Sequence, residues 1–380
     1  MDVSFIIPSF NERENIRPLV DDIHRAMSMA SPALDYEIFF VDDSVDNTPD
    51  VLAQVSREDE RVRFFHREGG KGLASAVVEG FRQTESKYVI VMDADLQHPP
   101  ALLPSIVERL QRGIDIVIPS RFVSGGSDGG LVGIRKAVSF VARQLGRIAL
   151  KRLRPISDCT SGYFGLRRSI LAETDLQPIG WKILIEILMR AHYTTVHEIP
   201  YEFQARDAGE SKMSWNEQWN YLRHLFRLMW SSEEDRRFPL FALIGLGGVL
   251  VNLLVLSFLV YGLASNHILA SIVASVVAMG NNYLWNDTFT WKDVRGQGKH
   301  PVLRMALFVL ISLVSIVMTT GVMRGLELLH VPIIAGQTVG IVLSTIWSYQ
   351  ANRHWTWGRS PTQRRMLQES KIRVTREANS

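Results

Sequence analysis

The sequence predicts two domains of different class: an α/β domain with a mostly parallel, doubly wound sheet of the Rossmann-like type, and an all-α transmembrane domain of four helices. Over residues 1–230, short apolar runs rich in β-branched residues alternate with amphipathic helical segments, as in parallel sheets covered by helices. From residue 238 to residue 286 the chain contains no Asp, Glu, Lys or Arg, a length of uncharged sequence typical of membrane spans. Several apolar runs of the first part end in acids, which gathers polar side chains at one edge of the sheet.

The first domain is expected to begin with a buried strand at residues 3–8 and a helix at 15–29. Further strands are expected at residues 37–44, 62–66, 88–92, 115–120 and 194–204, with helices at 50–56 and 73–84 between the early ones. The first strand lies so near the start of the chain that no signal peptide fits before it. We therefore expect the first domain to be cytoplasmic.

Composition excludes two classes of protein. A formal net charge of +3 over 380 residues is too small to indicate a nucleic-acid partner, and no basic helix or zinc pattern supports one. The single cysteine, Cys159, excludes an internal disulfide and fits a reducing compartment.

The most informative stretch is the end of the strand at residues 88–92, which is followed by Asp93, Ala94, Asp95, Leu96 and Gln97. Alternate side chains of an extended segment share a face, so Asp93, Asp95 and Gln97 can point together beyond the strand. Three oxygen ligands suit a hard ion such as Mg²⁺ or Mn²⁺, with open positions left for a diphosphate. An isolated Asp-x-Asp is more often a solvated turn, so the assignment needs the partners described next.

Acids and cations elsewhere complete a candidate nucleotide site. Asp42 and Asp43 end the second strand, where a carboxylate can accept hydrogen bonds from ribose hydroxyls or a base; a helix cap or turn is the alternative. Arg121 ends the fifth strand, and Arg135 follows a glycine-rich connection; both can neutralise a diphosphate. The stretch from Gly69 to Gly72 is either a weak phosphate cradle or an ordinary helix entry.

A basic segment after the last strand resembles a lid. Arg206 and Lys212 flank Gly209 and could fold over an anionic ligand, whereas an ordinary basic loop is the alternative.

Taken together these motifs resemble a known family. They are Pro8-Ser9-Phe10-Asn11-Glu12, Asp43-Ser44, Asp93-Ala94-Asp95-Leu96-Gln97-His98-Pro99-Pro100, Ser120-Arg121-Phe122, Asp158-Cys159-Thr160-Ser161-Gly162 and Arg206 with Gly209, Ser211 and Lys212. Their order is similar to that in inverting GT-A glycosyltransferases. The resemblance is strongest to polyprenol monophosphomannose synthases, the dolichol-phosphate mannosyltransferases, and it covers residues 1–230.

The resemblance implies roles for particular residues. The guanosine of the donor would be held by Pro8, Phe10, Glu12, Val41 and Asp43, with Asp42 beside them. The ribose, diphosphate and sugar would meet Asp93, Ala94 and Asp95. The metal ligands would be Asp95 and Gln97, joined by Asp93. Phosphates of the donor or of the lipid acceptor would be bound by Arg121, Arg135, Arg206 and Lys212, with Ser161 added on the lipid side. The residues closest to the chemistry would be Asp95, Arg121 and Arg135.

Two positions depart from the family pattern. Phe10 stands where a tyrosine is usual, which keeps base stacking and loses a hydroxyl. Cys159 replaces a usual proline, and we assign it no catalytic role.

Two amphipathic helices are expected just before the membrane part, at about residues 134–153 and 214–231. Both combine apolar positions at helical spacing with arginines or lysines, as in helices that lie at the headgroup level. Packing on the sheet is an equal alternative for the first of them.

Four spans are expected at residues 238–264, 267–285, 305–323 and 331–351. An internal repeat ends the second and the fourth: Tyr283, Asn286, Thr290 and Trp291 match Tyr349, Asn352, Thr356 and Trp357. This ending resembles a GtrA-like membrane domain, which gives domain bounds of 1–230, 231–358 and a basic tail at 359–380. Asn281, Asn282, Asn286 and Asn352 are expected to form interhelical hydrogen bonds rather than to recognise lipid.

Basic residues flank the middle loop between the two hairpins, and seven Lys or Arg follow from Arg353 onward. The positive-inside rule therefore places both chain ends in the cytoplasm. The tail is expected to be disordered or to lie on anionic lipid.

The resemblance implies a transferase that moves mannose from GDP-mannose to a polyprenyl (dolichyl-type) phosphate at the cytoplasmic membrane face, with inversion and with Mg²⁺ or Mn²⁺ as cofactor. One alternative is a UDP-sugar polyprenyl-phosphate glycosyltransferase for glucose or an aminosugar. Another is a flippase or scaffold for lipid-linked sugars, in which the first domain only binds nucleotide.

Overall fold

The computed structural model describes residues 1–29, 34–69, 72–129, 134–203, 215–295, 299–358 and 373–376. The chain divides into an N-terminal unit, which comprises Met1–Ser231 together with Lys371–Ser380, and a membrane unit, Ser232–Ser370. The chain therefore returns to the N-terminal unit after it has passed through the membrane unit.

The N-terminal unit is built on one sheet whose strands run in the order β3-β2-β1-β4-β6-β5-β7-β8. The strands are β1 (Val3–Ser9), β2 (Tyr36–Asp42), β3 (Val62–His66), β4 (Tyr88–Val91), β5 (Ile116–Ser120), β6 (Phe164–Arg167), β7 (Thr195–Pro200) and β8 (Arg373–Arg376). All neighbours are parallel except β6, which is antiparallel to β4 and to β5. The expectation of a mostly parallel sheet is confirmed, and β2 and β4 are both neighbours of β1.

Helices cover both faces of this sheet because alternate strand residues point to opposite sides. Phe5 and Ile7 pack with helices α1 (Arg13–Ser28), α2 (Thr48–Glu58) and α4 (Leu103–Gln111), whereas Ile6 packs with α3 (Leu73–Gln83) and α6 (Ile183–Arg190). Single-turn 3₁₀ helices lie at Pro100–Leu102, Lys151–Leu153 and Arg168–Leu171. The doubly wound arrangement brings the carboxyl ends of β1, β2 and β4 to one edge.

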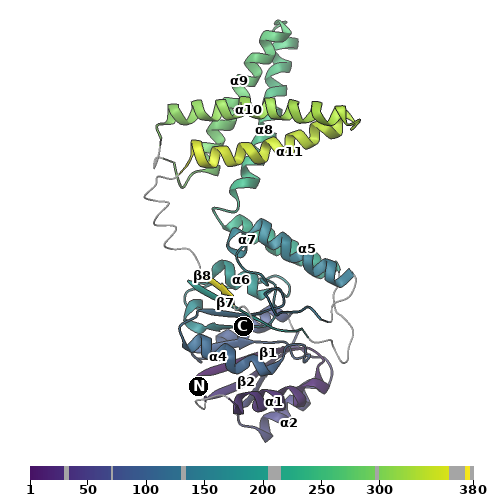
Figure 1. The fold of residues 1–380 in the computed structure, drawn as a ribbon, viewed down its shortest axis with the longest axis vertical. Coiled ribbons are helices and arrows are strands. Elements are labelled where there is room, and N and C mark those ends of the chain that lie inside the picture. The colour runs from purple at the N-terminus through teal and green to yellow at the C-terminus, as the bar shows by residue number, and fades with distance from the viewer. Residues whose placement is uncertain are drawn as a thin grey trace. The chain divides into compact units, whose positions relative to one another are not determined.

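Two amphipathic helices complete the N-terminal unit. They are α5 (Ile134–Ala149) and α7 (Trp215–Ser231), which lie side by side in Figure 1, and the Tyr221 hydroxyl of α7 donates to the Ala142 carbonyl of α5 at 2.5 Å. A buried pair formed by His224 and Glu186 ties α7 to α6. Large apolar side chains remain exposed on both helices: Phe140, Val141, Leu145 and Ile148 on α5, and Trp219, Leu222, Phe226 and Trp230 on α7.

The end of the chain differs from the expectation of a disordered or lipid-bound tail. Residues Arg373–Arg376 form β8, which pairs in parallel with β7 at the sheet edge and is drawn in yellow in Figure 1. Unpaired backbone groups of an edge strand readily accept a further strand, and β7 supplies such an edge. This strand could not be predicted, because four residues of mixed polarity show no strand pattern.

The membrane unit contains α8 (Arg237–Ser257), α9 (His267–Trp285), α10 (Pro301–Leu328) and α11 (Ile333–Ala351). Among the described residues three helical stretches are long and apolar enough to cross a membrane: Arg237–Gly262, His267–Thr290 and Pro301–Leu328. The helix α11 contains Gln337, Ser344 and Gln350 among its apolar residues and does not meet the same criterion. Length and hydropathy therefore give three candidate spans where four were expected.

The internal repeat of the sequence is also a repeat of structure. α9 and α11 each continue into a π-helical turn, Asn286–Thr290 and Asn352–Thr356. In each turn the asparagine amide donates to the carbonyl four residues earlier at 2.9 Å, and the threonine hydroxyl donates to the asparagine Oδ1 at 2.8 Å. The rings of Trp291 and Trp357 then stack with centroids 4.2 Å apart.

This geometry corrects the expected role of the asparagines. Asn286 and Asn352 are buried and bond within their own helix ends, and Asn281 accepts from Trp285 of the same helix. The Asn282 side chain lies beside Gly248 of α8 and fills the space that a side chain at Gly248 would take.

Candidate active site at the carboxyl edge of the sheet

The acidic turn after β4 is shaped by a single residue in an unusual conformation. Leu96 has a φ of 61°, in the left-handed region that non-glycine residues seldom occupy, and it reverses the chain between Asp95 and Gln97. The backbone N–H of Gln97 then donates to the Asp95 Oδ1 at 3.2 Å. Asp93, Asp95 and Gln97 are all partly exposed, whereas Ala94 is buried. The structure thus brings the three expected oxygen ligands into one short turn.

A histidine holds the start of this turn. His98 is buried, and its Nδ1 accepts a hydrogen bond from the Asp93 backbone N–H at 3.0 Å. Its ring stacks on Tyr163, with centroids 5.1 Å apart and an interplanar angle of 26°. Because Nδ1 accepts, the ring proton of the neutral imidazole lies on Nε2. His98 therefore supports the backbone of the turn.

Gly162 lies against the carboxylate of Asp93. A Cβ added at Gly162 would stand 3.0 Å from Oδ2 and 3.3 Å from Oδ1 of Asp93, closer than side chains ordinarily approach. The absence of a side chain here lets the Asp158–Gly162 turn approach the acidic turn. Two motifs that are far apart in the sequence thus form one site.

Arg121 is fixed by an acid from that same turn. Its Nε and Nη2 donate to the two oxygens of Asp158 at 2.8 and 3.0 Å, and the side chains of both residues are buried. Burial alone would lower the pKa of Arg121, but the paired carboxylate of Asp158 outweighs it and raises that pKa. The guanidinium carries further N–H donors, so it can still bind a phosphate oxygen.

Lys182, which precedes α6, is a cation that sequence reasoning missed. Its Nζ donates to the Thr160 carbonyl at 3.0 Å and lies 4.1 Å from the centre of the Trp181 ring. Burial and the nearby charge of Arg121 lower the pKa of Lys182 to about 8, although Asp158 and Asp93 act in the opposite direction. Lys182 therefore lies among the charges of Asp93, Asp158 and Arg121, next to the acidic turn, which makes it a candidate binding residue. The residues around it form no motif, so no sequence signal marked it.

The turns after β1 and β2 are bonded to each other. Asn11 has a φ of 56°; its backbone N–H donates to Ser44 Oγ at 2.7 Å, and its side chain accepts from the Val45 N–H at 3.0 Å. Next to it the Phe10 side chain is exposed, as a ring that stacks on a base must be. Glu12 accepts from Asn15 at 2.7 Å.

Asp43 is held by a cation that the sequence reasoning did not single out. Arg67 donates from Nε and Nη2 to the two oxygens of Asp43 at 2.6 and 2.5 Å. The side chains of both residues are largely buried. Arg67 therefore fixes the orientation of the carboxylate that was expected to meet the guanosine.

Several expected ligand-binding residues point inward. Asp42 is fully buried and bonds Ser9, Ser44 and His66, so it supports the turn rather than contacting a nucleotide. The Ser161 hydroxyl is buried and donates to the Tyr163 carbonyl at 3.0 Å, which removes it from the expected lipid-phosphate set. The side chains of Pro8 and Val41 are buried in paired strands, so only their backbone can face a ligand.

Three expected cations lie beyond what the structure describes. Arg206 and Lys212 fall outside the described residues, and with them the expected lid. Arg135 lies in α5, but its side chain also falls outside the described part.

The donor set fits a hard divalent ion that is shared with a ligand. The described residues contain no group of three or more His, Cys, Asp or Glu side chains that could hold a metal. Asp93, Asp95 and the amide of Gln97 provide oxygen ligands only, and too few to complete a coordination shell. The phosphates of a bound nucleotide would supply the remaining ligands, as Mg²⁺ sites commonly require.

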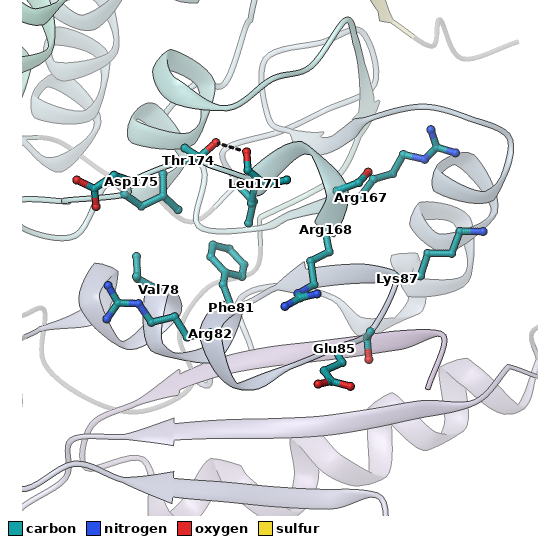
Figure 2. A pocket seen from close by; sticks show the side chains of 14 residues that line it. Val78, Phe81, Arg82, Glu85, Lys87, Arg167, Arg168, Leu171, Thr174 and Asp175 are labelled. Atoms are coloured by element: carbon teal, nitrogen blue, oxygen red, sulfur yellow. Dashed lines mark hydrogen bonds between the residues drawn. The ribbon is translucent and has the colours of Figure 1, made fainter.

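A large cavity lies elsewhere. It has a volume of about 760 Å³ and is lined by residues of α3, of the segment before β4 and of the 3₁₀ helix after β6, among them Phe81, Lys87 and Arg168 (Figure 2). Lys87 directly precedes β4, whereas Asp93 follows its other end. The cavity is therefore at the amino end of the strand, away from the acidic turn.

Two family models match the chain, one in each unit. Residues 4–174 match the model of glycosyl transferase family 2, and residues 240–357 match that of the GtrA/DPMS transmembrane domain. Among solved structures, glucosyl-3-phosphoglycerate synthase from Mycobacterium tuberculosis aligns with 60% of this chain and 79% of its own at 17% identity, with a TM-score of 0.45. That likeness is too weak to carry an argument.

Two curated relatives are much more similar. A dolichol-phosphate mannosyltransferase from Pyrococcus furiosus is 40% identical over 94% of this chain and 99% of its own. A dolichol-phosphate mannosyltransferase from Mycosarcoma maydis is 34% identical over 72% of this chain and 90% of its own. These matches confirm the resemblance that the motifs indicated, and they span both units. The chain belongs to the dolichol-phosphate mannosyltransferase family.

Proposed function

We propose that the protein transfers mannose from GDP-mannose to a polyprenyl phosphate of the dolichyl type at the cytoplasmic face of a membrane. The observation that carries this proposal is the match to the Pyrococcus furiosus relative, which extends over 99% of that protein and so includes both units. The acidic turn at Asp95 and the paired Arg121 support the proposal that the reaction takes place at this edge of the sheet.

The donor would bind along the edge formed by β1, β2 and β4. Phe10 would stack on the guanine, and Asp43, held by Arg67, would accept hydrogen bonds from the base or ribose. The side chains of Asp95, Gln97 and Asp93 would hold a Mg²⁺ or Mn²⁺ ion together with the diphosphate. The bound ion would neutralise negative charge on the departing GDP.

Cations of the chain would stabilise the remaining negative charge. Arg121 is held in place by Asp158, and Lys182 lies beside the same turn, so both are positioned before a substrate arrives. Preorganised donors of this kind supply the largest part of charge stabilisation in such sites. Arg135, Arg206 and Lys212 are proposed to join them on donor or acceptor phosphates.

No strong general base is required for this reaction. A phosphate monoester on the acceptor is ionised near pH 7 and can attack the anomeric carbon directly, with inversion to a β-linked product. His98 agrees with this, because it is buried and its Nδ1 already accepts from the Asp93 backbone.

The acceptor would reach the site along the membrane surface. The exposed apolar side chains of α5 and α7, among them Phe140, Trp219 and Phe226, suit insertion at the headgroup level. We propose that these two helices hold the N-terminal unit on the bilayer and that the membrane unit accommodates the isoprenoid.

The pairing of β8 supports four spans. Because β8 lies in the sheet of the N-terminal unit, the chain before and after the membrane unit must be on the same side of the bilayer. The number of crossings between them is then even. Three helices qualify by length and hydropathy, and we propose that α11 provides the fourth crossing. The basic flanks of the middle loop favour the cytoplasm for that common side.

A panel of radiolabelled nucleotide sugars, tested with the purified full-length protein and polyprenyl phosphate, checks the proposal. We expect lipid-linked product from GDP-mannose and little from UDP-glucose or UDP-aminosugars. Product formed mainly from a UDP-sugar would replace the proposed donor. Nucleotide binding without any transfer would favour a flippase or scaffold.

A further inference from the structure

The last strand of the chain places a cation opposite a buried acid. In the register of β7 with β8, Arg376 stands across from Glu198. The Nε of Arg376 donates to Glu198 Oε2 at 3.2 Å, and its Nη2 donates to the Pro155 carbonyl at 2.7 Å. Glu198 is fully buried, whereas the Arg376 side chain is half exposed. A buried carboxylate is costly without a counter-charge, so this contact stabilises the acid where it is.

The other oxygen of Glu198 holds the turn that carries Asp158. Glu198 Oε1 accepts from the Ser157 backbone N–H at 2.8 Å, from the Ser157 hydroxyl at 2.6 Å and from the Asp158 backbone N–H at 3.1 Å. Three donors on one carboxylate oxygen fix both the position and the direction of the turn. Arg143 of α5 also fixes the turn, because its Nη1 donates to the Ser157 carbonyl at 3.1 Å.

The Ser157–Asp158 turn also fixes Arg121. Asp158 accepts from two nitrogens of the Arg121 guanidinium, as described above, and it is fully buried. A continuous path of hydrogen bonds therefore runs from Arg376 through Glu198 and Asp158 to Arg121. It joins β8, at the edge of the sheet, to a cation of the candidate site.

We propose that Arg376 and Glu198 are positioning residues, and that docking of the C-terminal strand β8 sets the orientation of Arg121 through the Ser157–Asp158 turn. The effect on catalysis rests on the proposed function, because Arg121 is there a phosphate-binding group. The effect on the turn itself does not rest on it. The strand β8 thus contributes to the order of the candidate site, and in a protein that lacks β8 the Ser157–Asp158 turn and Arg121 are less well fixed.

The chain contains its own reporter for this turn. Cys159 is the single cysteine of the sequence, follows Asp158 directly and is fully buried. Burial raises the pKa of its thiol to about 12, so the folded protein should react slowly with thiol reagents. Any opening of the turn exposes this one thiol, and no other cysteine contributes to the signal.

The first measurement is the rate at which a chromogenic disulfide reagent modifies Cys159 in the full-length protein in detergent. We expect Arg376→Gln, and a chain that ends at residue 372, to raise this rate about tenfold, the change that a loss of about 1.4 kcal/mol in local stability produces. Arg376→Lys keeps the charge and should restore most of the protection. Arg112→Gln, which removes an exposed arginine that pairs within its own helix, is the matched control and should leave the rate unchanged.

The second measurement is transfer to polyprenyl phosphate by the same proteins. We expect Arg376→Gln to lower kcat/KM about three- to tenfold and Arg376→Lys to recover it, with Tm close to that of the original protein. In Glu198→Gln the buried charge is gone, so adding Arg376→Gln should cost little more; the two changes should not be additive.

The results of these measurements distinguish the positioning role of Arg376 and Glu198 from the proposed transferase function. If Arg376→Gln leaves both the Cys159 rate and kcat/KM unchanged, the positioning role is refuted. If Arg376→Gln and Arg376→Lys raise the rate equally, the positive charge at position 376 does not hold Glu198 and the turn, and the proposal also fails. If the original protein shows no transfer with any nucleotide sugar, the proposed function fails, and the Cys159 rates still decide whether β8 holds the turn.

Discussion

The two units of this protein use polar residues in opposite ways. In the N-terminal unit, unlike side chains follow or precede different elements: Asp95 follows β4, Arg121 follows β5 and Lys182 precedes α6. In the membrane unit, one set of contacts occurs twice, with Asn286, Thr290 and Trp291 matched by Asn352, Thr356 and Trp357. A repeated set is what two similar hairpins need in order to pack together. A convergent and unrepeated set is what a reaction needs, so we propose that the chemistry takes place in the N-terminal unit.

The largest effect should come from the acidic turn. Asp95→Ala removes a charged ligand of the proposed metal ion, and we expect transfer to fall by about 10³-fold or more with saturating Mg²⁺ or Mn²⁺. Transfer of labelled mannose to polyprenyl phosphate measures it. Asp22→Ala removes an exposed acid from α1 and is the control. Undiminished activity of Asp95→Ala would remove the metal site from the account.

Substitutions in the two π-helical turns of the membrane unit should lower its stability rather than its activity. Asn286→Ala and Asn352→Ala each remove a buried amide and leave a threonine hydroxyl without its acceptor, which costs about 1–3 kcal/mol. Because the two turns are equivalent, both variants should lower Tm in detergent by similar amounts. Activity of the folded fraction should remain. A large loss of activity at unchanged Tm would show that these turns take part in the chemistry.

A glycine in each unit sharpens the contrast. Gly162→Ala crowds the Asp93 carboxylate and should lower kcat about tenfold, since small displacements of reacting groups are costly. Gly280→Ala in α9 meets open space and should be neutral. Steady-state kinetics and Tm of both variants check this. Equal effects of the two changes would contradict the close approach of the two turns.

The smallest effect is a dependence on pH. The pKa of Lys182 is about 8, so its charge is present below that pH and is lost above it. Affinity for the diphosphate of GDP should therefore weaken about fivefold as the pH rises from about 7 to 9. Titration of GDP at several pH values measures it. Lys182→Met should bind more weakly at pH 7 and lose this dependence; an unchanged dependence would exclude Lys182 from the site.

Features built from residues that are close together in the sequence could be predicted, whereas contacts between distant residues could not. The positions of several strands along the chain and the Asp93–Gln97 turn were predictable, because an apolar run followed directly by acids describes both a buried strand and its polar end. Asp42 and Asp43 are adjacent and equally acidic, yet one is buried beneath the turn and the other pairs with Arg67. Only the direction of each side chain separates their roles, and the sequence does not state it.

Contacts between distant residues could not be predicted. Arg376 and Glu198 are 178 residues apart, with the whole membrane unit between them. Lys182 stands between an aromatic residue and an apolar helix, with no motif to mark it. The inward direction of Ser161 likewise follows from its hydrogen bond to Tyr163 and not from its place in a family motif.

The central claim is that the turn after β4 binds a divalent cation jointly with a diphosphate. Calorimetric titration of Mn²⁺ into the full-length protein, with and without GDP, tests it directly. Because the turn offers two carboxylates and one amide, we predict firm Mn²⁺ binding only when GDP is present, and its loss in Asp95→Ala. Mn²⁺ binding of equal strength without GDP, or GDP binding that is indifferent to both Mn²⁺ and Asp95, would contradict the account.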